Sequence, residues 1–350
     1  MLTTIDYNRI LVLLFLVMGV TPSATGQQTI HFTLHDFPIP VELQGEIVKL
    51  KEPLKNPHEL LLLDSFMIVR NINSSPAMDV YNLNTGELVS QFCKRGRGPG
   101  EVIAPFIFQF LEESNEIMVQ DIQGKKLVFY DWDSIVMNVP KKFTRSITLD
   151  KNILVRKIKH VKGENFFCDL IGHKDSYMNC LLNKNGNLIR LLKKYPKIDF
   201  PFDPMVGSNL FGVNIGISPS KENIILPFIY SDKIDIYNYK GDLITQFVGP
   251  NYKKLDVVQG INGATLTSRN TLAYNNPCAN NEYFLVPYAG ERYQYSFTPA
   301  SHILSFDISG KLLNHYVVSP SVTEIAVDWE KKIVYSINQN LEPTLYKYKF

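Results

Sequence analysis

The sequence predicts an all-β fold, a six-bladed β-propeller built from four-stranded antiparallel blades. From Gly45 onward, strand-like segments alternate with turn signals, and no long stretch has the period of a helix. A pattern of four strands also recurs about every 50 residues, which is typical of a propeller. Stacking such units in a ring buries the faces of each sheet and leaves only short outer edges. The alternative, a pair of β-sandwich domains, does not explain the regular spacing.

The first unit contains four strand-like segments. Leu60–Leu63 and Phe66–Val69 flank the turn Asp64-Ser65 and indicate a hairpin with buried arms. Met78–Tyr81 and Glu87–Phe92 follow as the third and fourth strands. A glycine-rich connection at residues 93–101 then leads to the next unit, because Gly and Pro favour a sharply shaped, exposed turn.

The same unit recurs further along the chain. Asp242–Phe247 repeats Glu87–Phe92 position by position, as an acid, two aliphatic residues, a hydroxyl, Gln and Phe. Phe92 and Phe247 are 155 positions apart, which is about three units of about 52 residues. Weaker copies lie at residues 126–134, with a turn at Trp132–Ser134, at 180–191 and, displaced by an insertion, at 302–313. Residues 322–350 make the sixth unit.

Turns and chain ends support the same units. After Val322 only three strand-like runs remain, so the spare strand near Gly45–Leu50 is expected to complete the last blade and close the ring. This makes residues 27–350 a single propeller domain. A positive φ is expected at the glycines that end four short polar turns. These glycines are Gly86, Gly186, Gly241 and Gly310.

Residues 1–26 are expected to be a signal peptide. Ile10–Met18 is an apolar run too short to span a bilayer, and Ala24-Thr25-Gly26 offers small residues for cleavage before Gln27. The alternative is an uncleaved anchor. No cysteine follows the apolar run, so a lipid anchor is not expected. The protein is therefore expected to be exported, to the periplasm or the outer surface, with no transmembrane span in the mature chain.

Charge and cysteine content exclude some classes of protein. Lys and Arg number 36 against 34 acidic residues, so no overall field favours nucleic acid as a partner. The four cysteines are too few for a disulfide scaffold and form no CxxC pair. Cys168 and Cys180 either bridge neighbouring strands or remain free buried thiols, and the sequence leaves both open.

Catalytic motifs are absent from the sequence. It contains no HExxH, no EF-hand loop and no Gly-x-Ser-x-Gly. We therefore expect no catalytic residue, no metal ligand and no cofactor. A divalent cation held in the central channel by carboxylates from several blades is the alternative, because the spacing of residues along the chain cannot reveal such a site.

A family resemblance rests on the order of these features. A strand, a Tyr/Phe–Asp/Asn pair, a turn glycine, a strand and the run Gly96-Arg97-Gly98-Pro99-Gly100-Glu101 follow one another. This order resembles the exported bacterial six-bladed TolB-like β-propeller proteins, many of which are classed as lipoproteins. The resemblance covers about residues 40–350 and implies the fold and export. It brings no catalytic residues, and the lipid-anchoring cysteine of many relatives is missing here.

The glycine-rich connection is the first candidate binding site. Arg95 and Arg97 could present forked donors to a carboxylate or phosphate, with Glu101 orienting one of them. The alternative is structural: the glycines permit the crossover between blades, while Arg97 and Glu101 pair with each other or with the backbone.

An aromatic segment in the fifth unit is the second candidate. Aromatic rings with polar tips on a loop suit a sugar, a peptide or a protein partner, although the rings could equally pack between blades. Pro287, Gly290 and Pro299 indicate an insertion loop rather than a regular hairpin. The candidate binding residues are Tyr288, Arg292, Tyr293 and Tyr295.

These observations predict a monomeric, non-enzymatic binding or scaffolding propeller of the bacterial cell envelope. Its partner would be a protein, a peptide or a glycan. The ligand would meet either the face with the inter-blade loops or the mouth of the channel. The alternative function is a metal-dependent hydrolase or lactonase with its site at the channel mouth, suggested by analogy with other six-bladed propellers.

Overall fold

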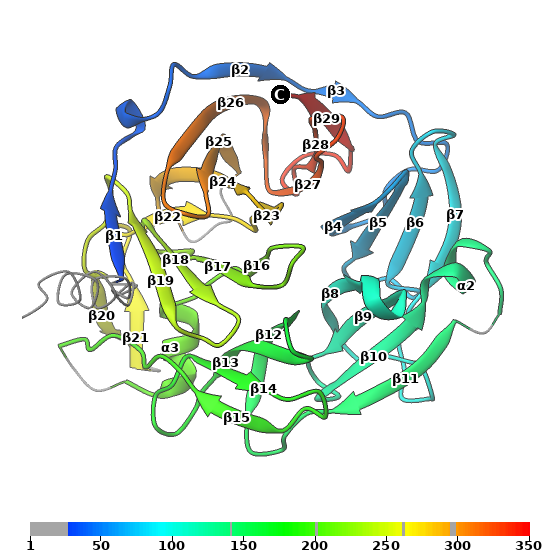
Figure 1. Ribbon diagram of the computed structural model, residues 1–350, viewed down its shortest axis with the longest axis horizontal. Coiled ribbons are helices and arrows are strands. Elements are labelled where there is room, and N and C mark those ends of the chain that lie inside the picture. Colours follow the sequence, from blue (N-terminus) through cyan, green and yellow to red (C-terminus); the bar gives the residue numbers. More distant parts are fainter. Residues whose placement is uncertain (1–26, 141, 200–201, 261–262, 295–298) are drawn as a thin grey trace, which may run out of the picture.

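A computed structural model describes residues 27–140, 142–199, 202–260, 263–294 and 299–350. In this part of the chain, six antiparallel blades surround a central channel (Figure 1). The six-bladed propeller predicted from the sequence is thus confirmed. The expected signal peptide, residues 1–26, lies outside the described residues.

Blades 1 to 3 each contain four strands, which run in chain order from the channel to the rim (Figure 1). The strands of blade 1 are β4 (Pro57–Leu63), β5 (Phe66–Asn71), β6 (Met78–Asn82) and β7 (Glu87–Phe92). Those of blade 2 are β8 (Pro105–Leu111), β9 (Glu116–Asp121), β10 (Lys126–Asp131) and β11 (Phe143–Thr148). Those of blade 3 are β12 (Leu154–Val161), β13 (Asn165–Ile171), β14 (Asn179–Leu182) and β15 (Leu188–Leu191).

Blades 4 to 6 follow the same plan with shorter inner strands. The strands of blade 4 are β16 (Gly216–Ile217), β17 (Asn223–Pro227), β18 (Lys233–Asn238) and β19 (Leu243–Val248). In blade 5, two inner pieces, β22 (Thr271–Tyr274) and β23 (Cys278–Ala279), precede β24 (Tyr283–Arg292), β25 (Ala300–Asp307) and β26 (Leu312–Val322). Blade 6 contains β27 (Glu324–Asp328), β28 (Ile333–Ile337) and β29 (Tyr346–Lys349), with β3 (Glu46–Ile47) as its outer strand.

The N-terminal segment closes the ring and wraps the outside of three blades (Figure 1). β3 pairs with β29, as expected for the spare strand near Gly45–Leu50. Before it, β1 (Gln28–His31) runs parallel to β19 and β2 (Val41–Gln44) runs parallel to β26, neither of which was predicted. Between β1 and β2 lies the short 3-10 helix η1 (Leu34–Asp36), and Phe32 and Phe37 on either side of it are buried.

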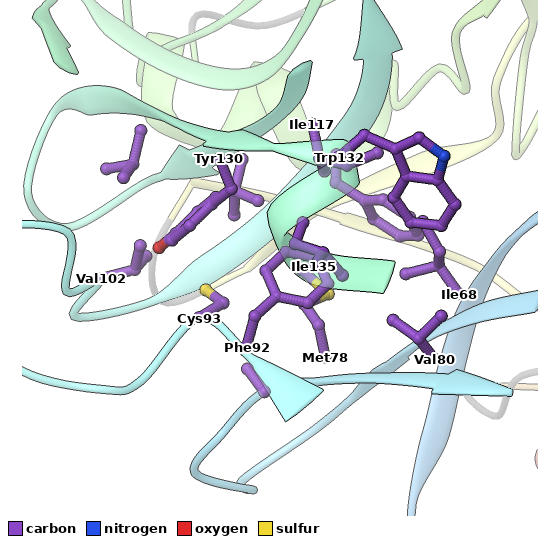
Figure 2. Close-up of a cluster of buried hydrophobic side chains, with 14 residues drawn as sticks. Ile68, Met78, Val80, Phe92, Cys93, Val102, Ile117, Tyr130, Trp132 and Ile135 are labelled. Carbon is purple, nitrogen blue, oxygen red and sulfur yellow. The ribbon is translucent and has the colours of Figure 1, made fainter. Parts of the chain in front are cut away.

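The hydrophobic core lies between neighbouring blades. Figure 2 shows the seam between blades 1 and 2, where Ile68 and Val80 of the first blade face Ile117 of the second. Alternate residues of each strand supply these contacts, because successive side chains point to opposite faces of a sheet. Every blade therefore depends on its neighbours for burial of its faces.

The predicted turn at Trp132–Ser134 is instead the start of a short helix, α2 (Trp132–Val136). The side chain of Asp131 accepts a hydrogen bond from the Ser134 amide at 2.8 Å and caps the helix. Trp132 and Ile135 are buried from the same helix face in the seam of Figure 2. Burial of these two side chains stabilises a helix that is too short to persist alone.

The insertion in the fifth unit lies earlier than expected. Tyr283–Arg292 is the regular strand β24, so the interpretation of this segment as a loop was wrong. Pro287 is tolerated because its missing N–H faces the break between β22 and β23, where its carbonyl accepts from the Asn275 amide at 3.0 Å. The additional residues form a hairpin between blades 4 and 5, made by β20 (Val257–Gly260) and β21 (Gly263–Leu266).

Three further features complete the fold. In the described part of the chain, the remaining helices are the 3-10 helix η2 (Glu112–Ser114) and the seven-residue α3 (Pro204–Leu210). The four predicted turn glycines all have positive φ, between 74° and 117°. Among the described residues, no helix combines the length and the apolar character needed to cross a membrane.

Candidate functional site

The central channel contains a cavity of about 390 Å³ to which all six blades contribute. It is lined by β4, β8, β12, β23 and β27 and by the residues around β16. The lining follows the inner strands to the turns that end them, and includes Glu112, Pro219 and Trp329. The glycine-rich connection precedes β8, so it lies at the opposite end of the inner strands. The hollow is therefore on the face away from that connection.

The walls of the cavity are largely apolar. Leucines, phenylalanines and branched aliphatic residues from the inner strands of four blades form them, together with one tryptophan at the rim. These residues are Leu61, Leu63, Phe108, Phe110, Ile217, Ile325, Val327 and Trp329.

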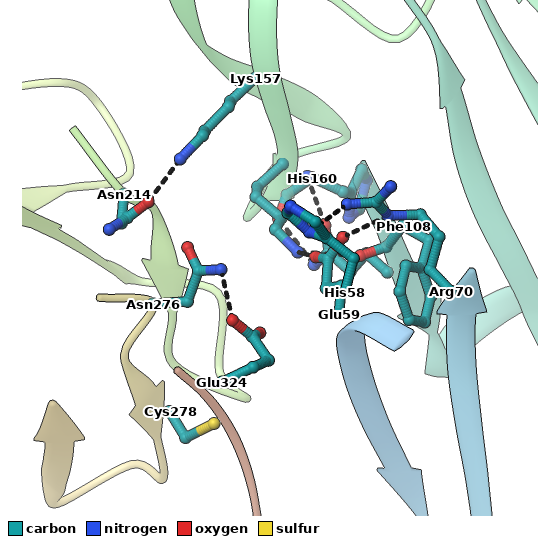
Figure 3. Close-up of polar contacts among 12 residues, drawn as sticks. His58, Glu59, Arg70, Phe108, Lys157, His160, Asn214, Asn276, Cys278 and Glu324 are labelled. Atoms are coloured by element: carbon teal, nitrogen blue, oxygen red, sulfur yellow. Dashed lines mark hydrogen bonds and ion pairs between the residues drawn. The ribbon is translucent and has the colours of Figure 1, made fainter. Parts of the chain in front are cut away.

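Charged side chains from blades 1 and 3 meet at the deeper end of the cavity. Arg70 Nε donates to Glu59 Oε2 at 3.2 Å, and its Nη2 donates to His58 Nδ1 at 2.8 Å (Figure 3). Lys159 Nζ lies 3.9 Å from Glu59 Oε1 and donates to the Phe108 carbonyl at 2.8 Å. Burial, followed by the positive charge of Arg70, lowers the pKa of His58 to about 4. His58 is thus a neutral acceptor at neutral pH.

Glu324 begins the inner strand of blade 6 and has a different environment. Its Oε2 accepts from Asn276 Nδ2 at 2.8 Å, and no ion pair links it to another described residue (Figure 3). Burial, reinforced by the negative charge of Glu59, raises the pKa of Glu324 to about 8. Close by, Cys278 Sγ donates to the Ile325 carbonyl at 3.3 Å, and burial raises the pKa of this thiol to about 12. Both groups are therefore mainly protonated at neutral pH.

Lys157 reaches the cavity from β12. Its ammonium group donates to Asn214 Oδ1 (Figure 3). It also donates to the Val213 carbonyl at 3.0 Å. Burial, followed by the charge of Arg156, lowers the pKa of Lys157 to about 7. Lys157 and Glu324 therefore both change protonation near neutral pH, and groups of this kind concentrate at functional sites.

Metal ligands do not cluster in the described part of the chain. Within it, no group of three or more His, Cys, Asp or Glu side chains is placed to hold a metal ion. The expectation of no metal or cofactor stays a prediction, and so does its alternative, a divalent cation in the channel.

A family model described as "TolB-like 6-blade propeller-like" matches residues 37–330. The chain belongs to this family. Comparison of the sequence with curated proteins gives no match.

Solved structures resemble this TolB-like propeller in fold. A presumed exported protein from Bacteroides fragilis NCTC 9343 has a TM-score of 0.58 at 13% identity, over 92% of this chain and 99% of that one. A DUF4221 family member from Bacteroides vulgatus ATCC 8482 scores 0.51 at 9% identity, over 89% and 97%. Streptogramin B lyase scores 0.51 at 10% identity, over 88% and 97%. At these identities the likeness shows the fold alone.

The arginines and the glutamate of the glycine-rich connection have separate positions in this TolB-like propeller. Arg95 Nε donates to the Ser74 carbonyl at 2.8 Å and its Nη1 to the Ile103 carbonyl at 3.2 Å. Glu101 Oε2 accepts from the Gly98 amide at 2.8 Å. Arg97 is exposed. Backbone contacts thus account for Arg95 and Glu101, and whether Arg97 binds a ligand stays a prediction.

Tyr288 lies in the interior, although it was predicted as a binding residue. Its hydroxyl donates to Asp232 Oδ2 at 2.9 Å, and Tyr274 donates to Oδ1 of the same carboxylate. The backbone N–H of Asn251 also donates to Asp232 Oδ2, at 2.9 Å. Tyr288 therefore holds the connection after blade 4 in place, and its buried ring is closed to a surface ligand.

The other candidate binding residues of this segment are Arg292, Tyr293 and Tyr295. Arg292 is exposed at the end of β24, and Tyr293 packs edge-on against Tyr230 with ring centroids 5.3 Å apart. Tyr295 lies outside the described residues. No prediction about ligand binding at these positions is tested by the structure.

The residues that converge in the cavity were missed by the sequence analysis. Glu59, Lys157 and Glu324 stand in the first strands of units 1, 3 and 6. A signal existed for Glu59 and Glu324, because each places a charge in a strand that is otherwise largely apolar, whereas Lys157 stands among other basic residues of its strand. That signal has meaning only when the inner strands are known to face a common channel.

Cys168 and Cys180 occupy paired positions on β13 and β14. Both are buried as free thiols, and the other two cysteines are free as well. The structure therefore contains the thiol form of the two alternatives left open by the sequence.

Proposed function

We propose that this TolB-like propeller is an exported, non-enzymatic binding module of the bacterial cell envelope, and that its ligand enters the channel cavity. The observation that carries the proposal is the cavity itself, with apolar walls and buried polar groups at its deeper end. Sites for small molecules or for parts of larger partners have this character, with an apolar lining and a few fixed polar groups. The fold likeness to a presumed exported protein supports the compartment.

The rigid ring suits binding. The cavity is built on strands that pair within blades and pack between them, so it exists before a ligand arrives. A preformed site avoids the entropic cost of ordering loops on binding. A peptide, a glycan or an exposed group of a protein could each place a small part in the cavity.

Retention of envelope compounds tests the proposal. The purified protein is incubated with an envelope extract and washed, and the bound compounds are identified by mass spectrometry. Ala279→Phe is designed to fill the cavity, because Ala279 is part of its lining. Ile189→Phe, on the exposed outer strand β15, is the matched control. We expect retention by the native protein and by Ile189→Phe, and loss with Ala279→Phe. Equal retention by all three, or none, would overturn the proposal.

A catalytic role is the second candidate. Lys157 and Glu324 change protonation near neutral pH, as general acid–base groups must. The alternative drawn from the sequence was a metal-dependent hydrolase or lactonase. If the retained compound is recovered unchanged after long incubation, with and without divalent cations, the binding function is supported. If a product accumulates, an enzyme is supported instead.

A further inference from the structure

We propose that the cavity takes a carboxylate carrying a single negative charge and an apolar body, with the carboxylate directed toward Lys157 and Glu324. This inference rests on the binding function proposed above and specifies the chemistry of the ligand. It goes beyond that function because it states which charge and which shape the site selects.

The balance of charge at the deeper end of the cavity favours an anion. Three cations and two carboxyl groups meet there, and Glu59 is already neutralised by Arg70 and approached by Lys159. Glu324 has an amide partner and is mainly protonated at neutral pH. The uncompensated charge is therefore positive and small, which matches a monoanion better than a phosphate dianion or a cation.

Donors for a carboxylate are present at the same place. The Lys157 ammonium carries three protons, and the protein accepts two of them, at Val213 and Asn214. A protonated Glu324 has one O–H to donate. A carboxylate needs donors of this kind, and hydrogen bonds in which one partner is charged are the stronger ones.

The walls define the rest of the ligand. Beyond the charged end, the lining is mostly aliphatic and aromatic up to Trp329 at the rim, with Gln109 and Ser218 along the wall and Glu112 and Lys221 at the rim. Its volume of about 390 Å³ lies within the range of about 300–1,000 Å³ that is typical of small-molecule sites. At the rim, Lys221 is paired with Glu113 and is thereby neutralised. The space therefore suits an apolar chain or side chain behind one carboxylate.

Two sources offer such a group, a free organic acid and the C-terminus of a peptide. Octanoate represents the first. N-acetyl-Ala-Leu with a free carboxylate represents the second, and the same dipeptide as its amide is the matched uncharged control. Comparing the two acids identifies the source, while comparing acid with amide tests the requirement for charge.

Binding should be coupled to proton uptake. The charged groups that face Lys157 and Glu324 are Glu59 on β4, Arg70 on β5, Arg156 on β12 and Asp169 on β13. Lys159, also on β12, lines the same cavity and approaches Glu59. An anion between the two groups favours the protonated form of both, so binding raises both pKa values. Titration calorimetry at about pH 7.5, in two buffers of different ionisation enthalpy, measures this uptake.

We expect at least one acid to bind with uptake of protons, and the amide to bind about tenfold more weakly or not at all. Affinity for the acid should fall as the pH rises from about 6 to 9. Lys157→Gln should weaken acid binding about tenfold. Lys162→Gln, on the exposed turn after β12, is the matched control and should leave it unchanged. The pH series with the native protein remains informative if Lys157→Gln does not fold.

The possible results distinguish the carboxylate proposal from the binding function on which it rests. Equal binding of acid and amide, or acid binding without proton uptake, would overturn the carboxylate proposal. If neither acid binds while the loss caused by Ala279→Phe persists in the retention experiment, the carboxylate proposal falls and the binding function stands. If nothing is retained and no acid binds, both fall.

Discussion

Arg70 and Glu59 form an ion pair across β4 and β5 beside the channel, with 3.2 Å between Nε and Oε2. Less than a tenth of either side chain is exposed. The pair brings a carboxylate to the cavity without leaving its charge uncompensated, and the second nitrogen of Arg70 is held by His58.

Removing the cation of this pair should destabilise the protein strongly. Arg70→Met removes the cation that is hydrogen-bonded to the buried Glu59 carboxylate and leaves only Lys159, 3.9 Å away. Breaking a buried pair of this kind typically costs about 3–5 kcal/mol. The free energy of unfolding in urea measures the loss. Arg190→Met is the control, because Arg190 pairs with Asp242 on the surface with about half of each side chain exposed. Its loss should be at most about 1 kcal/mol. Similar effects for both variants would contradict the role assigned to burial.

Asp235 should make stability depend on pH. Burial alone would raise its pKa, but Lys233 and Lys193 outweigh burial and lower it from the ordinary 3.8. A lowered folded pKa means that the carboxylate stabilises the fold above the ordinary pKa and stops doing so as the pH falls below it. Asp235→Asn should cost about 2 kcal/mol at neutral pH. The difference from the native protein should shrink below about pH 4.

Urea unfolding of both proteins at several pH values checks this expectation. Asp175→Asn serves as the control, since Asp175 is exposed. A difference between native protein and Asp235→Asn that stays constant down to low pH would count against the ionised carboxylate as the cause.

Gly86 should tolerate no side chain. Its φ is 74°, and an added Cβ would lie 2.6 Å from the carbonyl oxygen of Lys49 in the N-terminal segment. Gly163 has a similar φ of 80°, but the nearest atom would be 3.6 Å away, on the side chain of Asn165. Gly163→Ala should therefore cost only the conformational strain of about 1–2 kcal/mol. Gly86→Ala should cost clearly more, as measured by urea unfolding, and equal costs would refute the steric explanation.

Strand β2, which pairs with the outside of blade 5, should stabilise the ring through its one buried leucine. Leu43 on β2 is 5% exposed and packs with Tyr316 and Tyr348, whereas Val41 on the same strand is 48% exposed. Leu43→Ala should cost about 2–5 kcal/mol because it leaves a cavity in this cluster. Val41→Ala should cost less than about 1 kcal/mol. Thermal unfolding with limited proteolysis of the N-terminal segment distinguishes them, and equal melting temperatures would contradict the role of β2.

Much of the fold could be predicted because its information is local. Glu87–Phe92 and Asp242–Phe247 repeat a strand pattern, and the structure places both as outer strands of their blades. Gly86 and Gly241 end short turns, and their positive φ follows from the lack of a side chain. The predictions of secondary structure were wrong where tertiary packing overrides the preference of the local sequence. Trp132 starts a helix because its ring is buried, and Pro287 sits in a strand opposite a break in its neighbour.

Little of the candidate site could be predicted. Arg95 and Arg97 were predicted as binding residues because they stand close together in the sequence, yet the cavity lies at the other end of the inner strands. The aromatic segment looked like a loop because of its prolines and glycine, and the structure pairs most of it as β24. The residues of the cavity are far apart in the sequence, and the sequence alone does not show which residues meet across the channel.

The sequence by itself determined the repeating unit, the number of blades and the strand that closes the ring, because strand periodicity and turn chemistry are properties of neighbouring residues. Only the tertiary structure decided that Glu59, Lys157 and Glu324 share one cavity, since each comes from a different blade. It also decided the charge states of Lys157 and Glu324. The pKa of a carboxyl or amine depends on burial and on nearby charges, and both arise only when the inner strands face one another.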